Sequence, residues 1–175
     1  PVRLHPLPNS RASFRSTTRK TYAIMSEGCQ SHTFKPVLFY VGEGGYLPKR
    51  GSDFAAGYDL VTPEDFSVNP GKHILIKTRV FYSGLEGHML QIRDRSSMAW
   101  KEQLNVSGGI IDEDYRGQIG VILRNNSDEI KSFKAGERIA QAIFTPVSHP
   151  TIEQVDSVEA LGTTTRGAGG FGSTG

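Results

Sequence analysis

The chain has 175 residues, of which 37% are hydrophobic and 22% are charged, and its formal net charge is +2. These values are ordinary for a soluble globular domain and exclude a highly charged, disordered chain. The longest uninterrupted apolar run, at residues 37–41, is far too short for a membrane-spanning helix. The single cysteine excludes an internal disulfide framework, and the five histidines show no metal-ligand spacing.

The first 26 residues carry five basic side chains and no acidic one, so the rest of the chain holds 15 basic against 18 acidic residues, a difference of −3. This stretch is rich in Ser and Thr and has no apolar signal core. Three interpretations remain open: an organelle-targeting remnant, a basic arm that contacts nucleic acid, or sequence upstream of a start at Met25. We expect residues 1–33 to form a disordered extension and the protein to be intracellular, in cytoplasm, nucleus or a targeted organelle.

From residue 34 onward the pattern is typical of a β protein. Apolar, aromatic or β-branched runs recur at spacings near ten residues, at 34–41, 73–82, 88–93, 118–123 and 138–147. Within one of them, Ile119, Val121 and Leu123 alternate with other residues at the period of a strand. Turn-forming residues separate the runs. The spacing predicts a sandwich, barrel or jelly roll.

Only residues 96–102 have the composition of a helix, for which Ser96 would be the N-cap. We therefore expect an all-β domain with one short helix over residues 34–160. A flexible glycine-rich segment would follow over residues 161–175.

Five segments carry residues suited to chemistry: Ala55-Ala-Gly-Tyr-Asp-Leu60, Arg95-Ser-Ser-Met-Ala-Trp-Lys101, Gly108-Gly-Ile-Ile-Asp-Glu-Asp-Tyr-Arg-Gly117, Gly136-Glu-Arg-Ile-Ala-Gln141 and Arg166-Gly-Ala-Gly-Gly-Phe-Gly-Ser-Thr-Gly175. Each also has a plain structural interpretation. Asp59 could be a turn carboxylate, and Arg95 with the two serines after it could be an ordinary N-cap. The acidic residues 112–114 could belong to a solvated loop, and Gly136 could be part of a tight turn.

The acidic cluster has the sharpest chemical interpretation. Like charges at Asp112, Glu113 and Asp114 repel one another and favour a nearby cation or hydrogen-bond donor. In an extended segment, Asp112 and Asp114 would share one face and Glu113 the other. A carboxylate in a pocket can orient and deprotonate a water molecule, and Tyr115 offers a flat face to a sugar. The residues alone do not say which carboxylate is the base.

The glycine-rich segment suggests a lid that closes over a nucleotide. Glycines let successive N–H groups converge on an anion, and Arg166 adds a fork of donors suited to phosphate. Ser173 and Thr174 add hydroxyls, and Phe171 offers an apolar face to a base. A dinucleotide-binding fingerprint is rejected because it needs a following helix, and a Walker loop because it needs a lysine. The remaining alternative is a plain flexible tail.

Taken in order, the five segments closely resemble those of the trimeric dUTPases, over residues 34–175. The matches at 109–117 and 166–175 are nearly verbatim. The resemblance implies a β jelly roll that assembles as a homotrimer, each active site drawing on all three chains. It also implies hydrolysis of dUTP to dUMP and pyrophosphate with Mg²⁺, a reaction that keeps uracil out of DNA and supplies dUMP for dTMP synthesis.

The same resemblance implies roles for individual residues. Asp112 would hold the water that attacks the α-phosphorus, and Asp59 would hold Mg²⁺ through waters. The implied substrate-binding residues are Arg95, Ser96, Ser97 and Gln141 at the phosphates or water, Gly109, Ile110 and Tyr115 at uracil and deoxyribose, and Arg166, Gly170, Phe171, Gly172, Ser173 and Thr174 in the closing tail.

The chain departs from the family in its second motif, which usually reads Pro-Arg-Ser-Gly and here is Asp94-Arg-Ser-Ser97. Asp94 would weaken phosphate binding unless it faces Arg93 or solvent, and we expect both changes to be tolerated. A catalytically silent relative acting as a binding or regulatory module, and a deoxycytidine deaminase, are the alternatives. The retained Asp112 and the complete glycine-rich clamp favour the enzyme.

Overall fold

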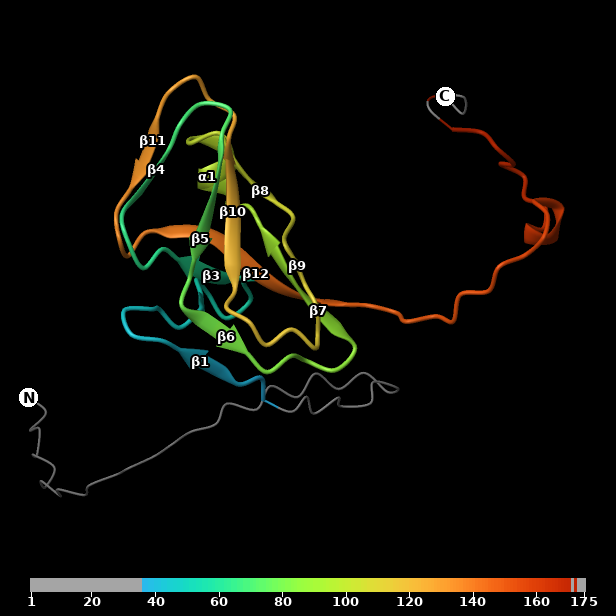
Figure 1. Cartoon of the computed structure of the whole chain (residues 1–175), viewed down its shortest axis with the longest axis horizontal. Coiled ribbons are helices and arrows are strands. Elements are labelled where there is room, and N and C mark those ends of the chain that lie inside the picture. Colours follow the sequence, from blue (N-terminus) through green and yellow to red (C-terminus); the bar gives the residue numbers. More distant parts are fainter. Residues whose placement is uncertain (1–35, 171, 173–175) are drawn as a thin grey trace, which may run out of the picture. The chain divides into compact units, whose positions relative to one another are not determined.

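The computed structural model describes residues 36–170 and 172, so the extension expected over residues 1–33 lies outside the described residues. The described part contains twelve strands, one α-helix and one 3₁₀ helix (Figure 1). The helices are α1 (Ser96–Trp100) and η1 (Glu159–Leu161). The strands are β1 (Phe39–Val41), β2 (Lys49–Arg50), β3 (Tyr58–Val61), β4 (Phe66–Val68), β5 (His73–Lys77), β6 (Val80–Tyr82), β7 (His88–Arg93), β8 (Leu104–Ser107), β9 (Ile110–Ile111), β10 (Gly120–Asn125), β11 (Lys131–Phe133) and β12 (Arg138–Pro146).

The strands form two main antiparallel sheets, confirming the expected all-β jelly roll with one short helix. The order is β5-β10-β8 in the three-stranded sheet and β2-β3-β12-β7-β9 in the five-stranded sheet. Two smaller pairs, β1-β6 and β11-β4, complete the described fold. Strands distant in sequence lie side by side, because β12 pairs with both β3 and β7.

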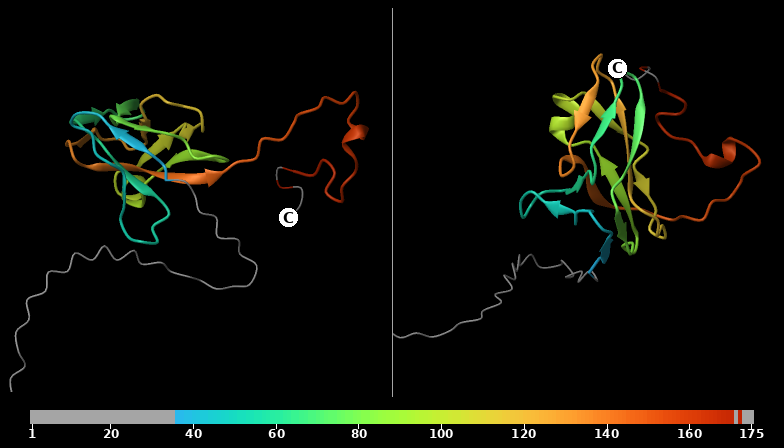
Figure 2. Two further views of the ribbon diagram at one scale, coloured as in Figure 1. Left: turned by 90° about the horizontal axis from the view of Figure 1, so that it is seen from below. Right: turned by 60° about the vertical axis from the view of Figure 1, so that its left-hand side comes forward.

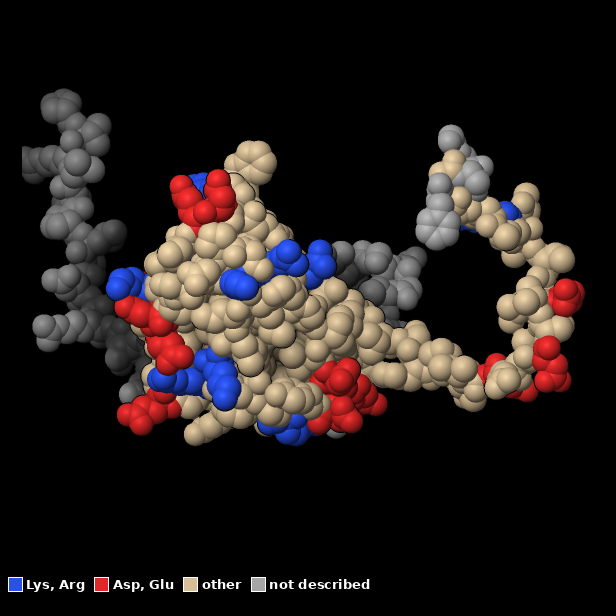
Figure 3. Space-filling model, turned by 45° about the horizontal axis from the view of Figure 1, so that its top comes forward, with Lys and Arg blue, Asp and Glu red and all other residues tan. Residues whose placement is uncertain are grey.

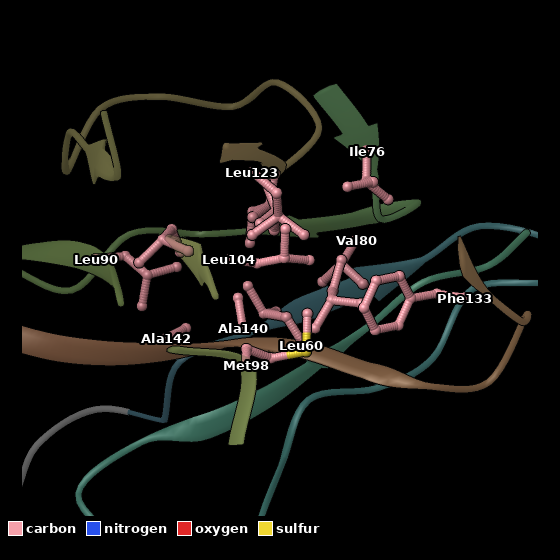
Figure 4. Packing of buried hydrophobic residues seen from close by; sticks show 14 of the residues in the cluster. Leu60, Ile76, Val80, Leu90, Met98, Leu104, Leu123, Phe133, Ala140 and Ala142 are labelled. Carbon is pink, nitrogen blue, oxygen red and sulfur yellow. The ribbon is translucent and has the colours of Figure 1, made fainter. Parts of the chain in front are cut away.

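The hydrophobic core lies between these sheets. Leu104 and Leu123 of the three-stranded sheet lie opposite Leu60 and Ala140 of the five-stranded sheet (Figure 4). Along β10 the buried Val121 and Leu123 alternate with exposed neighbours, which is the predicted period of two. Where a strand alternates regularly in this way, a residue next to a core residue points outward. This alternation decides which polar side chains reach the surface where a site can form.

Two local expectations were wrong. The run at 73–82 is not one strand, because Arg79 has φ 62° and divides it into β5 and β6. The helix ends at Trp100 rather than residue 102, and its N-cap is Arg95, without a side-chain capping bond, rather than Ser96. Both serines of the second motif therefore lie inside the first turn of α1.

Beyond β12 the chain runs into the glycine-rich tail (Figure 2). Residues 148–168 are all exposed, and η1 is the only helix assigned there. Exposed apolar side chains occur along this stretch, including Ile152, Val158 and Leu161. Within the described residues, no helix is long and apolar enough to cross a bilayer.

Candidate functional site

Functional side chains from two of the sequence motifs stand in a row across the five-stranded sheet. Asp59 of β3 is paired with Lys49 of β2 and with Gln141 of β12, and Gln141 is paired with Arg93 of β7. Directly opposed residues in antiparallel strands share a face. Because the neighbouring Leu60 is buried in the core, this row lies on the outer face of the sheet.

Asp59 holds two arginines. Its Oδ1 accepts a hydrogen bond from Arg95 Nε at 2.8 Å, and its Oδ2 accepts one from Arg138 Nη1 at 3.2 Å. Arg95 Nη1 also donates to the main-chain carbonyl of Arg138 at 3.2 Å. The pair of Asp59 and Arg95 is mostly shielded, with side chains 18% and 22% exposed. The guanidinium of Arg95 is thus fixed in position, and Arg138, which the sequence analysis did not assign a role, helps to fix it.

The side chains around Asp59 fit a magnesium ion only if water molecules lie between the ion and the carboxylate. Among the described residues, no group of three or more Asp, Glu, His or Cys side chains is placed to hold a metal. Both oxygens of Asp59 accept N–H groups, which leaves lone pairs for metal-bound waters but no preformed cage. Mg²⁺ keeps several waters and is commonly bound by one or two carboxylates together with substrate phosphates.

The unusual Asp94 faces neither Arg93 nor open solvent. Its carboxylate accepts the main-chain N–H of Val106 and, at 2.9 Å, the Nδ2 group of Asn105, both in β8. Its main-chain carbonyl accepts Gln141 Nε2 at 2.8 Å. Asp94 therefore ties the loop that carries Arg95 to the three-stranded sheet. Its negative charge is directed to hydrogen-bond donors of β8.

We expect Asp94→Ala to lower the stability of the protein by about 1–3 kcal/mol, because the partly buried N–H of Val106 loses its acceptor. Thermal or denaturant unfolding measures the effect. Asp128→Ala, which removes an exposed carboxylate for which no hydrogen bond or ion pair is described, is the matched control and should leave stability nearly unchanged. Equal stability of both variants would show that Asp94 is not a structural tie.

The glycine pair of the third motif crosses between the sheets. The strands on its two sides do not pair with each other: β8 pairs with β10, and β9 pairs with β7. Gly109 has φ +87°, and a Cβ there would collide with the carbonyl oxygen of Ile92. Its own carbonyl accepts the N–H of Ile92 at 2.7 Å. The connection between β8 and β9 is thus a crossing turn, and glycine is required because the backbone lies against β7.

A cavity of about 670 Å³ opens beside this turn. Gly109, Ile110, Asp112 and Tyr115 line it, and β5 and β10 add the apolar Leu75 and Ile122 and the cationic Lys77. The Tyr115 hydroxyl donates to the carbonyl of Gln118 at 3.1 Å, which holds its ring. Main-chain polar groups, a flat ring and apolar walls together suit a base with its sugar.

The three acidic residues share one cavity, and Asp112 also reaches another. They occupy a turn, in which Tyr115 N donates to Asp112 O at 3.2 Å, so the alternation of an extended segment does not apply to them. Glu113 Oε2 accepts the N–H of Gly87 at 2.8 Å. Glu113 and Asp114 line a second cavity of about 430 Å³, whereas Asp112 lines both that cavity and the one beside the glycine turn.

The motif residues fall into two separate places. The cavity that contains Asp112 and Tyr115 does not include Asp59, Arg95 or Gln141. Asp59 lines another cavity, of about 490 Å³, with Lys49 and Arg138 among its walls. Single-chain geometry therefore gives a pocket beside the glycine turn and a separate cationic pocket at Asp59, rather than one continuous site.

The tail adds a third group of residues. Arg166 Nε donates to Gly169 O at 2.7 Å, and Gly167 N donates to Thr164 Oγ1 at 3.1 Å. In the described part of the tail, these bonds join tail residues to one another. Gly170 and Gly172 are described, the latter at φ +90°, while Phe171, Ser173 and Thr174 lie outside the described residues.

Charge on the surface is mixed. On the face seen in Figure 3, Lys and Arg side chains are interspersed with Asp and Glu. That face offers no continuous basic path for a nucleic-acid backbone, which would need clustered positive charge.

Comparison with known proteins gives a consistent result. Residues 44–175 match the family model described as dUTPase. The deoxyuridine 5'-triphosphate nucleotidohydrolase of Solanum lycopersicum is 42% identical over 135 residues, covering 77% of this chain and 78% of the relative. A point mutant of the Staphylococcus bacteriophage 80alpha dUTPase, solved with dUpNHpp, has a TM-score of 0.73 at 26% identity, covering 80% of this chain and 98% of that one. A point mutant of the phage phi11 dUTPase, whose structure reveals how a structural Mg(II) ion is coordinated, has a TM-score of 0.66 at 24% identity, covering 71% and 99%.

Proposed function

The chain belongs to the dUTPase family, and from this membership we propose that the cavity beside the glycine turn binds the nucleoside and that Asp112 is the catalytic base. The protein is a dUTP pyrophosphatase, which hydrolyses dUTP to dUMP and pyrophosphate. The position of Asp112 carries the residue assignment. It is the acidic side chain that lines the nucleoside cavity, whereas Glu113 is bound to the N–H of Gly87.

In the proposed step, the carboxylate of Asp112 accepts a proton from a water molecule as the water oxygen attacks the α-phosphorus. The new bond joins this oxygen to the α-phosphorus. The bond between the α-phosphorus and the bridging oxygen to the β-phosphate breaks, and that oxygen leaves with pyrophosphate. A positioned base of this kind contributes about 10²–10⁴-fold to rate.

Substrate selection follows from the walls of the cavity. Main-chain groups of Gly109 and Ile110 would pair with the edge of uracil, and the ring of Tyr115 would pack against deoxyribose and leave no room for a 2′-hydroxyl. A tight fit around C5 of the base would exclude the methyl group of thymine. Steric exclusion of this kind can discriminate more strongly than the roughly 1–3 kcal/mol of one added methylene contact.

We assign the substrate phosphates to the cationic site around Asp59 and Arg95. Arg95, fixed by Asp59 and Arg138, would donate its remaining N–H groups, with Ser96, Ser97 and Gln141 beside it. Asp59 would accept hydrogen bonds from waters of a magnesium ion bound to the substrate phosphates. When bound, Mg²⁺ would neutralise phosphate charge and act as a Lewis acid.

A complete site would need more than one chain, and we propose a homotrimer with shared sites. The nucleoside cavity and the cationic pocket are separate in one chain. Around the nucleoside cavity, Leu75 and Ile110 are 56% and 55% exposed, so apolar area remains for a second copy to cover. The exposed stretch after β12, with its apolar Ile152 and Leu161, is suited to lie on another copy and to bring the tail to that copy's site.

Pyrophosphate release from dUTP, UTP, dTTP and dCTP, each with Mg²⁺ and with EDTA, tests the function and its selectivity. We expect fast release from dUTP with Mg²⁺ and little from the other nucleotides or after chelation. Release from UTP at the same rate would contradict the role given to Tyr115. If folded, assembled protein released nothing from any nucleotide, the protein would be a catalytically silent relative.

A further inference from the structure

A buried tyrosine outside the five motifs contacts the main chain of the proposed base. Tyr82, at the end of β6, is 3% exposed, and its hydroxyl donates to the carbonyl of Asp112 at 2.7 Å. The carbonyl of Ile111 lies 3.4 Å from the same hydroxyl. The ring itself belongs to the hydrophobic core and packs near Phe39, with 6.3 Å between the ring centroids. A rigid core side chain therefore ends in a polar group that holds the loop of Asp112.

The turn after Tyr82 adds further contacts to the same loop. Gly87 N donates to the carboxylate of Glu113, and Gly84, at φ +79°, lies so close that a Cβ would collide with the Glu113 carbonyl. From within the loop, Arg116 Nη1 donates to that carbonyl at 2.7 Å. The loop thus packs against the connection between β6 and β7. Of the residues that make these contacts, Tyr82 is the one that bonds to Asp112 itself.

We infer that Tyr82 is a positioning residue for hydrolysis, which fixes the carboxylate of Asp112 at the distance and angle needed to activate water. The inference rests on the proposed role of Asp112. The backbone of Asp112 sets where its short side chain can reach, so a shift of the carbonyl moves the carboxylate. Burial raises the pKa of the Tyr82 hydroxyl, with Arg116 opposing this, so the hydroxyl keeps its proton and remains a donor at neutral pH.

The test is Tyr82→Phe, which keeps the ring in the core and removes only the hydroxyl. We expect kcat for dUTP to fall by about tenfold or more, because misplacing a catalytic group by about 1 Å costs up to about 10²-fold. The KM for dUTP and the affinity for dUpNHpp should stay within about twofold, because Gly109, Ile110 and Tyr115, to which we assign the base and the sugar, do not bond to the Tyr82 hydroxyl.

Thr78→Val is the matched control. Thr78 is fully buried, and its hydroxyl donates to the carbonyl of Ile119 at 2.7 Å and accepts the N–H of Val80 at 3.3 Å, so the change removes buried hydrogen bonds without touching the loop. It should lower the melting temperature about as much as Tyr82→Phe and leave kcat near the parent value.

A Tyr82→Phe enzyme with parent kcat would overturn the inference, as would equal losses of kcat in both variants, which would indicate general destabilisation. In either case, dUTP hydrolysis and the role of Asp112 would stand, because they are tested by the nucleotide panel and by changing Asp112 itself.

Discussion

Asp112→Asn is expected to bind dUTP with near-normal affinity and to hydrolyse it about 10²–10⁴-fold more slowly than the parent enzyme. The amide has the size and shape of the carboxylate, so the cavity beside the glycine turn keeps its form. A neutral amide cannot accept the proton of the attacking water. Pyrophosphate release measures the chemical step, and calorimetric titration with dUpNHpp measures binding.

Asp114→Asn is the matched control. Asp114 lies in the same loop as Asp112, but it lines the second cavity and not the nucleoside cavity. It should retain most of the activity. Near-parent turnover by Asp112→Asn, or a larger loss at Asp114, would mean that the base is a different carboxylate.

Removing residues 166–175 is expected to leave a folded trimer that hydrolyses dUTP at least about 10²-fold more slowly, as when donors that stabilise developing charge are removed. The truncation removes Arg166 and the glycine-rich clamp, and among the described residues it takes away none of the hydrophobic core. Size-exclusion chromatography and thermal unfolding check assembly and folding, and pyrophosphate release measures activity. Full activity of the truncated chain would exclude a role of the tail as a lid.

Mixing the two inactive variants tests whether the tail acts on a neighbouring chain. In mixed trimers, a truncated chain supplies an intact Asp112 and an Asp112→Asn chain supplies an intact tail. We expect activity to return after the subunits are exchanged or co-expressed, because some sites then have both parts. If the tail closed over its own chain, no site would have both, and the mixture would stay inactive.

The sequence predicted the fold class and the family correctly, because both depend on strong local patterns. Alternation at Ile119, Val121 and Leu123 survives in the structure as the buried side of β10 and the residue that precedes it. Shorter strands such as β4 and β11 were not predicted, since three residues that mix polar and apolar types give too little periodicity. The break at Arg79 was also missed, because a non-glycine residue with positive φ has no clear signature.

The candidate site was predictable as a set of residues but not as an arrangement. Motif order indicated Asp59, Arg95 and Asp112, yet only the strand pairing shows that Asp59 holds Arg95 while Asp112 lies in a different cavity. Asp94 looked like a charge beside the phosphates, and its partners in β8 come from eleven and twelve positions further along the chain. Such pairings depend on tertiary packing, which local composition does not encode.

Gly84 lies against the loop that carries Asp112, and this closeness limits which residues the position tolerates. Any side chain at this position would have to push the Glu113 carbonyl aside and adopt a positive φ, although Gly84 lines neither cavity that contains Asp112. A saturation mutagenesis screen scored by growth would therefore group Gly84 with the residues of the pocket.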